Sequence, residues 1–371
     1  MINVTENNKN MRAIKSVVFN YQPNTQILDL LNTFRQMVNE AIHICISENI
    51  KGRLNLRNRI YHDFNEKYGL VTCYNYSVAE VAWSIVKKHK RWHRKPFAKH
   101  LMLKMDSYNY TLNISLLSIP YKKGERILIP LQYGDYQRSF LMDKTIKRGS
   151  ITITARNIMI SFSKEAGTIE PLRKVGYDIN EKSLVSSDGI RYDLSEVSRI
   201  RNEYGYRRKK FYEKHSYDTR LKKKSSQNSR EKNRIKQFLN RVSKDVVQKA
   251  KESKSLIVME KLTHIRNSMK KGNGKGKKLR GRINRWSFHI LQQQIVYKAN
   301  WEGVPVEFVN PKNTSKTCSV CGQVNKKLKA EKEWQCPCGV IHNRDLNASR
   351  NVVARSNQVC MAVVQPQAVG R

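Results

Sequence analysis

Three carboxylates of this sequence stand where acids could act together. Asp178 and Glu260 each lie at the end of an apolar segment, RKVGYDIN and SLIVME, with the pattern of a buried strand, and Asp345 opens a predicted helix. A carboxylate at the end of a buried strand is costly to desolvate unless a cation neutralises it. Taken singly, each acid is more often a solvated end of a strand or helix. Three acids from separate elements of one α/β sheet could instead hold two divalent cations, which activate water and stabilise the leaving oxygen of a phosphodiester.

Four of the seven cysteines lie within 21 residues and form two close pairs, Cys318-x-x-Cys321 and Cys336-x-Cys338. A glycine beside each pair lets the backbone turn so that its amides approach the sulfurs. Four thiolates in this pattern favour one tetrahedral Zn²⁺ ion in a ribbon, and such a closed site is structural and not catalytic. Two alternatives are open: His342 could substitute for one thiolate, or the cysteines could carry no metal. The odd cysteine count favours a metal site with buried thiols elsewhere over a disulfide framework.

The charge of the chain indicates a polyanionic partner. The 371 residues include 71 Lys and Arg against 30 Asp and Glu, a net charge of +41. Such an excess repels itself until a polyanion neutralises it, so the predicted partner is nucleic acid. Hydrophobic residues make up 39% of the chain, which excludes a purely disordered basic tail. We see no membrane span and no apolar core of a secretory signal, so we expect a soluble intracellular protein without a membrane partner.

Three segments concentrate the positive charge. Residues 201–236 carry 14 Lys and Arg against 4 Asp and Glu, and residues 270–285 combine eight cations with four glycines and no acid. A predicted helix also ends in the run KKHKRWHRK, residues 87–95. A charge run is usually a solvated face, but so many cations with so few acids favour contacts with the phosphates of nucleic acid. The candidate contact residues are Lys87, Lys88, Arg91, Lys275, Lys277, Lys278 and Arg280.

The first half of the chain combines strands with a helical insertion. Residues 12–21 have the pattern of one strand, and an apolar stripe at steps of four and three predicts a helix over 27–45. Ser77-x-x-Glu80 predicts a capping box at the start of a later helix. From about 98 to 165 apolar residues alternate, as in a predicted strand over 110–116. Short strands at this spacing predict a small barrel, which the first strand would complete and the helices would interrupt.

The second half has the pattern of an α/β domain. The strands 173–180 and 255–260 end in the two acids, and VPVEFVNP (304–311) predicts a third strand. A hairpin with its turn at Ser187-Asp188-Gly189 follows the first strand, and helical stretches separate the others. The cysteine cluster interrupts the chain after the third strand, and residues 342–355 close it as a short helix.

In their order these motifs resemble the TnpB family, transposon-encoded RNA-guided DNA endonucleases that are similar to the compact type V CRISPR effectors. The segments that carry the resemblance are VGYDIN with Asp178, IVMEKL with Glu260, QQQIVYKANWEGVPVEFVNP, NTSKTCSVCG, WQCPCG and HNRDLNASRN with Asp345. Strong matching covers roughly residues 170–355, whereas the first half matches in layout only. Two departures are Tyr177, where a small apolar residue usually precedes the first acid, and the tighter second cysteine pair.

The resemblance implies a multidomain α+β protein whose RNase H-like (RuvC) α/β nuclease domain contains an inserted zinc ribbon. Asp178, Glu260 and Asp345 would hold two catalytic Mg²⁺ ions, and Arg344 would lie close to the scissile phosphate or the third acid. A wedge-like N-terminal β-barrel with an inserted helical recognition lobe would hold a guide RNA made from the transposon end. It would also read a short motif beside the double-stranded target DNA. The expected form is a monomeric ribonucleoprotein in a prokaryotic cytoplasm, associated with the nucleoid.

The same expectations divide the chain into six segments, at the positions where its pattern changes. They are 1–22, the first strand of the wedge-like barrel; 23–97, the helical recognition lobe; 98–170, the remainder of the barrel; 171–313, the first part of the nuclease domain; 314–341, the zinc ribbon; and 342–371, the last nuclease motif with the C-terminal tail.

Other functions would use these features differently. A non-cleaving, RNA-guided DNA-binding repressor on the same scaffold should have lost at least one acid, and this chain has all three. A strand-transferring transposase would need a separate domain for terminal DNA, and neither end shows a helix-turn-helix pattern. A transposition accessory protein is a related alternative. An RNA-binding protein with a zinc ribbon would explain the charge and the cysteines but would leave the three acids without a role.

Overall fold

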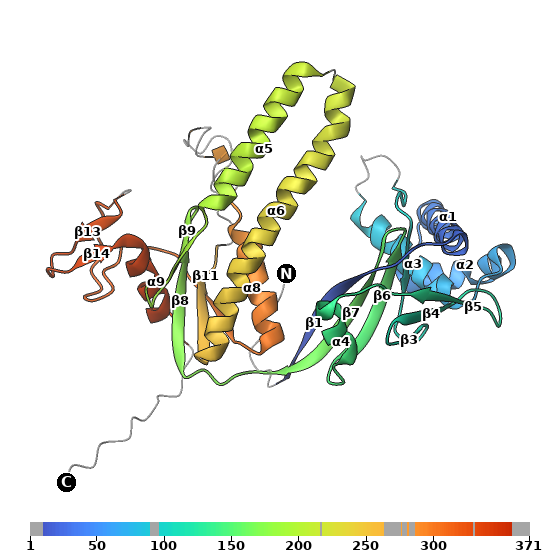
Figure 1. Cartoon of the computed structure of the whole chain (residues 1–371), viewed down its shortest axis with the longest axis horizontal. Helices are drawn as coiled ribbons and strands as arrows, with labels where there is room; N and C mark the ends of the chain where they lie inside the picture. The colour runs from blue at the N-terminus through green and yellow to red at the C-terminus, as the bar shows by residue number, and fades with distance from the viewer. Residues whose placement is uncertain are drawn as a thin grey trace, which may run out of the picture. The chain divides into compact units, whose positions relative to one another are not determined.

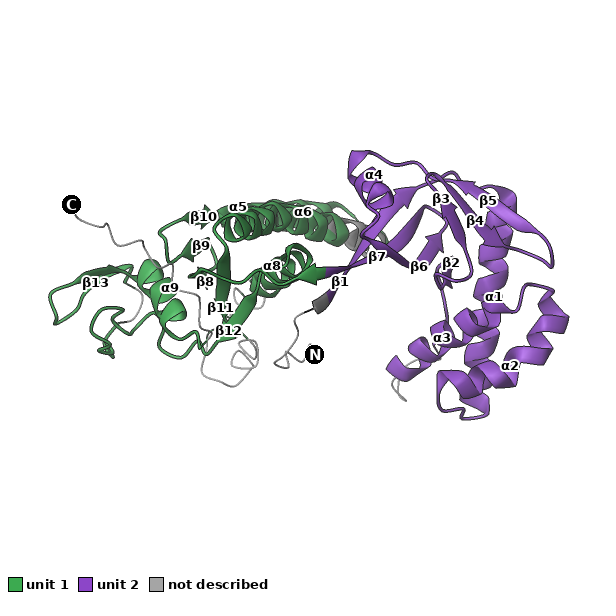
Figure 2. Cartoon of the chain, turned by 90° about the horizontal axis from the view of Figure 1, so that it is seen from below, with its two compact units in different colours: residues 1–11, 166–371 green, residues 12–165 purple. Residues whose placement is uncertain are grey.

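The structure, a computed structural model, describes residues 10–89, 96–215, 217–262, 276, 280–281, 286–328 and 331–357. The chain divides into two compact units, residues 12–165 and residues 1–11 with 166–371 (Figure 2). Each unit buries apolar residues of its own. Among the described helices, none combines the length and the hydrophobicity that a membrane span requires.

Three helices form part of the unit 12–165. α1 (Thr25–Ser47) begins after Asn24, whose side chain accepts a hydrogen bond from the Ile27 amide. α2 (Arg53–Tyr68) ends at Gly69, which has the left-handed conformation of a helix C-cap. α3 (Cys73–Lys88) packs against both. The predicted capping box is wrong, because α3 begins at Cys73 and Ser77 lies buried inside it.

The strands of this unit form two sheets. One sheet has the order β1 (Asn10–Asn20), β7 (Asn157–Gly167), β6 (Lys147–Thr154) and β2 (Met102–Met105). The other sheet has the order β3 (Thr111–Asn113), β4 (Leu116–Pro120) and β5 (Arg126–Pro130). Reciprocal backbone hydrogen bonds between Asn20 and Gln132 join the two sheets at one corner. A short helix, α4 (Asp135–Met142), follows the second sheet.

The single strand predicted over 110–116 is wrong. The chain turns back at Ile114, which has a positive φ of 46°, so that β3 and β4 form a hairpin. Leu112 and Leu117 face each other across it and both are buried, while Ile114 is exposed at the turn. An apolar residue at the turn continues the alternation of period two, and the sequence pattern therefore hides the reversal.

A five-stranded mixed sheet forms the centre of the second unit. Its order is β10-β9-β8-β11-β12, in which β8 (Arg173–Ile179), β11 (Ser255–Glu260) and β12 (Val306–Val309) run parallel. β9 (Ser183–Ser186) and β10 (Arg191–Asp193) continue from β8 as the predicted antiparallel hairpin. Every residue of β11 is buried, which is typical of a parallel strand covered on both faces.

Helices cover both faces of this sheet (Figure 1). α5 (Ser195–Lys214), α6 (Tyr217–Glu252) and α8 (Phe288–Glu302) pack on one face, in a core that includes Ile257 and Met259 of β11. α9 (Arg344–Ala354) packs on the other face, where its Val352 joins Leu256 and Val258. Alternate residues of one strand thus enter two cores, which explains why the sequence of β11 is apolar without a break.

A small ribbon lies between β12 and α9 in the chain. Its strands, β13 (Glu333–Gln335) and β14 (Ile341–Asn343), pair antiparallel. Leu328, Trp334 and two of the cysteines form its core. A segment of this size buries too little apolar surface to be stable by itself, so a bound metal would contribute much of its stability.

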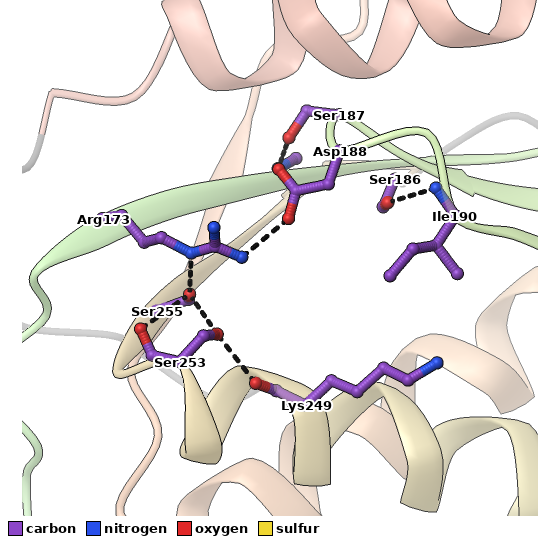
Figure 3. A network of polar contacts seen from close by, with 9 residues as sticks. Arg173, Ser186, Ser187, Asp188, Ile190, Lys249, Ser253 and Ser255 are labelled. Atoms are coloured by element: carbon purple, nitrogen blue, oxygen red, sulfur yellow. Dashed lines mark hydrogen bonds and ion pairs between the residues drawn. The ribbon is translucent and has the colours of Figure 1, made fainter.

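A polar network fixes the edge of the five-stranded sheet where β8 and β11 begin (Figure 3). Arg173 donates from Nε to Ser255 Oγ at 3.1 Å and from Nη2 to Asp188 at 2.8 Å, in the turn between β9 and β10. The Ser187 hydroxyl accepts a hydrogen bond from the Gly176 amide at 3.2 Å. These contacts hold the hairpin beside β8 and thereby support the register of the strand that carries Asp178.

Candidate active site and metal centre

The sheet places two of the three predicted acids next to each other. β8 and β11 run parallel with Tyr177 opposite Met259, so Asp178 and Glu260 follow side by side at the carboxyl ends of the two strands. Asp178 is 8% exposed and Glu260 is 7% exposed. Two neighbouring carboxylates that are both removed from water disfavour each other's ionisation. The edge of the sheet is therefore a site of concentrated and poorly solvated negative charge.

The third acid is brought to this edge by the close approach of α9 to β8. A Cβ atom on Gly176 would lie 2.3 Å from the carbonyl oxygen of Ser349 and 2.8 Å from Val353 Cγ2, so the packing requires glycine at this position. The Asn343 side chain caps α9 by accepting from the Leu346 amide. Asp345 stands in the first turn, where an acid is favourable to the helix dipole.

Asp178 has the more perturbed carboxyl group of the buried pair. Burial is the main cause that raises its pKa to about 8, and the neighbouring charges of Glu260 and Asp345 raise it further. Asn180 opposes the rise by donating from Nδ2 to Asp178 Oδ2 at 2.7 Å, and the charge of Arg344 opposes it as well. Because these two groups do not cancel the rise, the ionised carboxylate lacks sufficient compensation from the protein.

Glu260 is held at both its side chain and its main chain. Thr314 donates from Oγ1 to Glu260 Oε1 at 2.5 Å, and Gln292 donates from Nε2 to the Glu260 carbonyl oxygen at 2.7 Å. Burial raises the pKa of Glu260, against the opposing effects of the Thr314 hydroxyl and the charge of Arg355. This carboxyl group is therefore oriented by the protein before any ligand binds.

Asp345 is less buried and has different neighbours. Its Oδ2 atom accepts from Ser183 Oγ at 3.5 Å and lies 3.9 Å from Arg191 Nη1. In the described part of the chain, the four cysteines are the one group of three or more such residues gathered closely enough to hold a metal ion, and the three acids do not form a second one. The structure thus gathers the acids at one edge without drawing them into a single tight cluster.

The four predicted cysteines do form such a cluster. Cys318 Sγ lies 3.8 Å from Cys338 Sγ, and Cys321 Sγ lies 3.5 Å from Cys336 Sγ. Gly322 and Gly339, with φ of 78° and 90°, provide the turns after the pairs. Four sulfurs within 4.8 Å of one another could hold one metal ion such as Zn²⁺.

His342 contacts this cluster from the side. Its Nε2 atom lies 3.0 Å from Cys318 Sγ, and its ring packs against Trp334 with the ring centroids 4.7 Å apart. It is not among the four residues whose ligand atoms all lie within 4.8 Å. Burial alone would raise the pKa of Cys318, but hydrogen bonds from the Cys321 and Val320 amides and from His342 lower it to about 6. His342 therefore supports the thiolate that a metal requires.

The structure describes three of the seven residues that are predicted to contact nucleic acid. Lys87 and Lys88 are exposed at the end of α3, and Arg280 is half-buried. The other four, Arg91, Lys275, Lys277 and Lys278, lie outside the described residues. The role of all seven in binding nucleic acid stays a prediction.

Several residues around the acids were not identified from the sequence. Asn180, Gln292 and Thr314 contact the two buried acids, and each lies within a segment that carries the family resemblance. The sequence feature that could have identified these three residues is a polar side chain within a segment that carries the resemblance. Ser183 and Arg191, which face Asp345, lie in an ordinary hairpin, and nothing in the sequence distinguishes them.

Comparison with known proteins identifies relatives of this chain in sequence and in fold. Residues 288–352, from α8 through the ribbon to α9, match the family described as Cas12f1-like, TNB domain. A TnpB-like protein of Methanocaldococcus jannaschii is 33% identical over 264 residues, which cover 66% of this chain and 91% of that protein. The CRISPR-associated endodeoxyribonuclease Cas12f1 of Sulfoacidibacillus thermotolerans is 35% identical over 115 residues, or 30% of this chain and 25% of that protein. A solved Cas12f1-sgRNA-target DNA complex aligns with a TM-score of 0.57 at 16% identity, over 88% of this chain and 81% of that chain.

The structural alignment defines the class of fold first, a mixed α/β protein similar to the compact Cas12f effectors. The sequence relative then defines the family, because the match extends over nearly the whole length of the Methanocaldococcus protein. This chain belongs to the TnpB family. The resemblance seen in the motifs is thereby confirmed.

Proposed function

We propose that this protein is an RNA-guided DNA endonuclease of a transposable element, which hydrolyses phosphodiester bonds of double-stranded target DNA beside a short adjacent motif. The observation that carries the proposal is the buried pair Asp178 and Glu260 at the carboxyl ends of two parallel strands. The relatives support it, since Cas12f1 is named an endodeoxyribonuclease and the aligned Cas12f1 complex contains sgRNA and target DNA.

The order of the five strands supports an RNase H-like (RuvC) nuclease domain. An antiparallel hairpin, β9 and β10, extends the sheet on one side of β8, and the parallel strands β11 and β12 extend it on the other. The acids occupy β8, β11 and the closing helix α9, which bring them together from distant parts of the sequence. In this scheme the fold serves to gather the three carboxylates.

The residues at this edge suit divalent cations. The raised pKa values of Asp178 and Glu260 show that their carboxylates lack compensation, and oxygen donors are the ligands that Mg²⁺ prefers. Asp178, Glu260 and Asp345 would hold two Mg²⁺ ions, which when bound supply activation of water and stabilisation of the leaving oxygen. Arg344, the neighbour of Asp345, would lie close to the scissile phosphate or to this third acid.

The remaining parts would bind nucleic acid or support the nuclease. The unit 12–165, with two sheets and three long helices, would be the wedge-like barrel and recognition lobe that hold the guide RNA and read the adjacent motif. A protein that leaves sequence reading to base pairing needs mainly to neutralise phosphates, as the net charge of +41 permits. The cysteine cluster would hold one structural Zn²⁺ ion, and the complex would be a monomeric ribonucleoprotein.

The test is a plasmid-cleavage assay with a matched guide RNA, in which Asp178→Ala, Glu260→Ala and Asp345→Ala are each compared with wild type. We expect each change to abolish cutting and to leave guide and target binding intact, because binding rests on dispersed cations and on base pairing. Glu165→Ala, at an exposed acid of β7, is the control and should cut normally.

Two results would contradict the proposal. A variant that cuts near the wild-type rate would remove its residue from the site. The repressor would be favoured by wild-type protein that binds its target but does not cut it, whichever divalent metal or adjacent motif is tested.

A further inference from the structure

The loop that leads into the ribbon reaches the active-site edge through one side chain. Thr314 lies between β12 and the first cysteine pair, is only 4% exposed, and donates its hydroxyl to Glu260 Oε1 at 2.5 Å. The two residues are 54 positions apart in the chain. Within the described residues Glu260 Oε2 accepts no hydrogen bond. The contact therefore fixes one of the two carboxylate oxygens of Glu260.

The same loop is bound to α9 by two buried asparagines. Asn351 donates from Nδ2 to the carbonyl oxygens of Thr314 and Thr317, at 2.8 and 2.6 Å. Asn347 donates to the Thr317 carbonyl oxygen at 2.7 Å and accepts from the Ser319 amide at 2.9 Å. Cys318 lies between Thr317 and Ser319 in the chain. The first cysteine of the ribbon is thus joined on both sides to the helix that also carries Asp345.

We propose that Thr314 is a positioning residue for Glu260, that Asn351 holds Thr314 in place, and that the ribbon acts on the acid site through these two side chains. The inference rests on the proposed endonuclease function and specifies how the ribbon serves it. It assigns the ribbon a role at the acids in addition to any contact with nucleic acid.

The physical reason lies in the flexibility of the glutamate side chain. Glu260 can rotate about three bonds, and each conformation that points the carboxylate away from the site weakens cation binding. The main chain is already held by Gln292, so the Thr314 hydroxyl removes most of the freedom that is left. Residues that orient a metal ligand in this way commonly contribute about 10- to 100-fold in metal affinity or activity.

The first experiment measures Mn²⁺ binding to the full-length protein by the loss of the free-ion EPR signal. The double variant Asp178→Ala with Glu260→Ala gives the background from other sites. Thr314→Val keeps the shape of the side chain and removes the hydroxyl, and we expect about tenfold weaker acid-dependent binding. Thr314→Ser, which keeps the hydroxyl, should stay within about twofold of wild type. Thr317→Val, which removes a nearby hydroxyl bonded to the Asn313 carbonyl, is the matched control.

The second experiment repeats the measurement with Asn351→Asp, which keeps the size of the side chain but removes both Nδ2 donors. We expect weaker Mn²⁺ binding in the same direction as Thr314→Val, with the zinc content unchanged. In the assembled complex with guide RNA, both variants should need a higher Mg²⁺ concentration for half-maximal cleavage. Melting curves recorded on the same preparations separate this effect from loss of folded protein.

Two outcomes overturn the inference, and they differ from each other. In the first, wild type cuts, and Thr314→Val either binds Mn²⁺ as well as Thr314→Ser does or loses Mn²⁺ binding only in proportion to the loss of folded protein. Thr314 would then merely satisfy the hydrogen bonding of a buried carboxyl group. The endonuclease function would stand in that case. Should wild type bind no more Mn²⁺ than the acid-free double variant, the proposed function would fail and the positioning role would fail with it.

Discussion

At the scale of single residues, the acid site opposes its own ionisation. Asp178 has a pKa of about 8 in the folded protein, whereas an aspartate in an unfolded chain has a pKa of about 4. Between these two values the folded state retains a proton that the unfolded chain has released. Stability therefore falls as pH rises through this range, since the unfolding free energy decreases wherever the native state binds more protons.

We predict how the melting temperature of the full-length protein changes between about pH 5 and pH 8. In buffer without Mg²⁺ we expect the melting temperature to fall with rising pH. Added Mg²⁺ should recover part of the loss at the upper end, because a cation that binds only the native carboxylates stabilises the folded state. Asp178→Asn cannot ionise and should flatten the curve. A variant curve as steep as that of wild type would assign the pH dependence to other groups, such as histidines.

Single residues also show what the sequence could reveal about this site. Asp178 and Glu260 were identified because each closes an apolar run, and the structure indeed places them side by side. The positioning contacts were not predictable in the same way. The hydrogen bond from Thr314 to Glu260 depends on the length of the loop after β12 and on the packing of α9. Neither of these can be inferred from the presence of a threonine at position 314.

At the scale of elements, α9 packs on β8 at backbone contact in the unit that contains residues 166–371. The helix carries Asp345 and the strand carries Asp178, and they approach so closely at Gly176 that a Cβ atom would overlap the Ser349 carbonyl oxygen. The atoms in the way are backbone, which cannot move aside by a change of rotamer. The distance between two of the acids therefore depends on the absence of one methyl group.

We expect Gly176→Ala to displace α9, to destabilise the unit by about 1–3 kcal/mol as overpacking does, and to reduce cleavage more than it reduces folding. Gly205→Ala is the matched control, because Gly205 lies within α5 and a Cβ atom there would meet nothing within 4 Å. Alanine at that helical position should be neutral or stabilising by up to about 1 kcal/mol. Thermal melts and the plasmid-cleavage rate measure the two effects. Equal behaviour of the two variants would show that the α9–β8 contact tolerates a side chain.

Elements with strong periodicity were predictable, and short ones were less so. The stripe over 27–45 and the apolar runs of β8 and β11 became one helix and two strands close to the expected bounds. The capping box failed because Ser77 faces the helical core, where its hydroxyl cannot mark a helix start. The strand over 110–116 failed because Ile114 forms the turn.

At the scale of the whole molecule, the dominant quantity is the excess of positive charge. A net charge of +41 predicts a polyanion as partner but cannot say which polyanion, since Lys and Arg contact the phosphates of RNA and DNA alike. The division into two units after residue 165 lies close to the change of sequence pattern at residues 170 and 171, but composition alone does not fix it. It follows from which strands pair, and pairing depends on contacts between residues far apart in the chain.

The last prediction concerns the basic segment 270–285. Neutralising Lys275, Lys277, Lys278 and Arg280 to glutamine should weaken target binding and flatten its dependence on salt. Each phosphate contact that is lost lowers the slope of log K against log salt by about 0.9 for duplex DNA, so the four changes should lower it by up to about 3.6. Filter binding across a salt series measures the slope, and melting curves should hardly change.

A loss of four charges anywhere on so basic a protein reduces its attraction for nucleic acid, and the control must remove that general effect. The same changes at Lys122, Lys123, Lys144 and Lys147, all exposed in the unit 12–165, alter the net charge equally. If the segment 270–285 holds phosphates directly, its variant should lose more slope than the control, because counterion release counts contacts and not total charge. Equal slopes in the two variants would mean that the charge of this segment acts only through the field of the whole molecule.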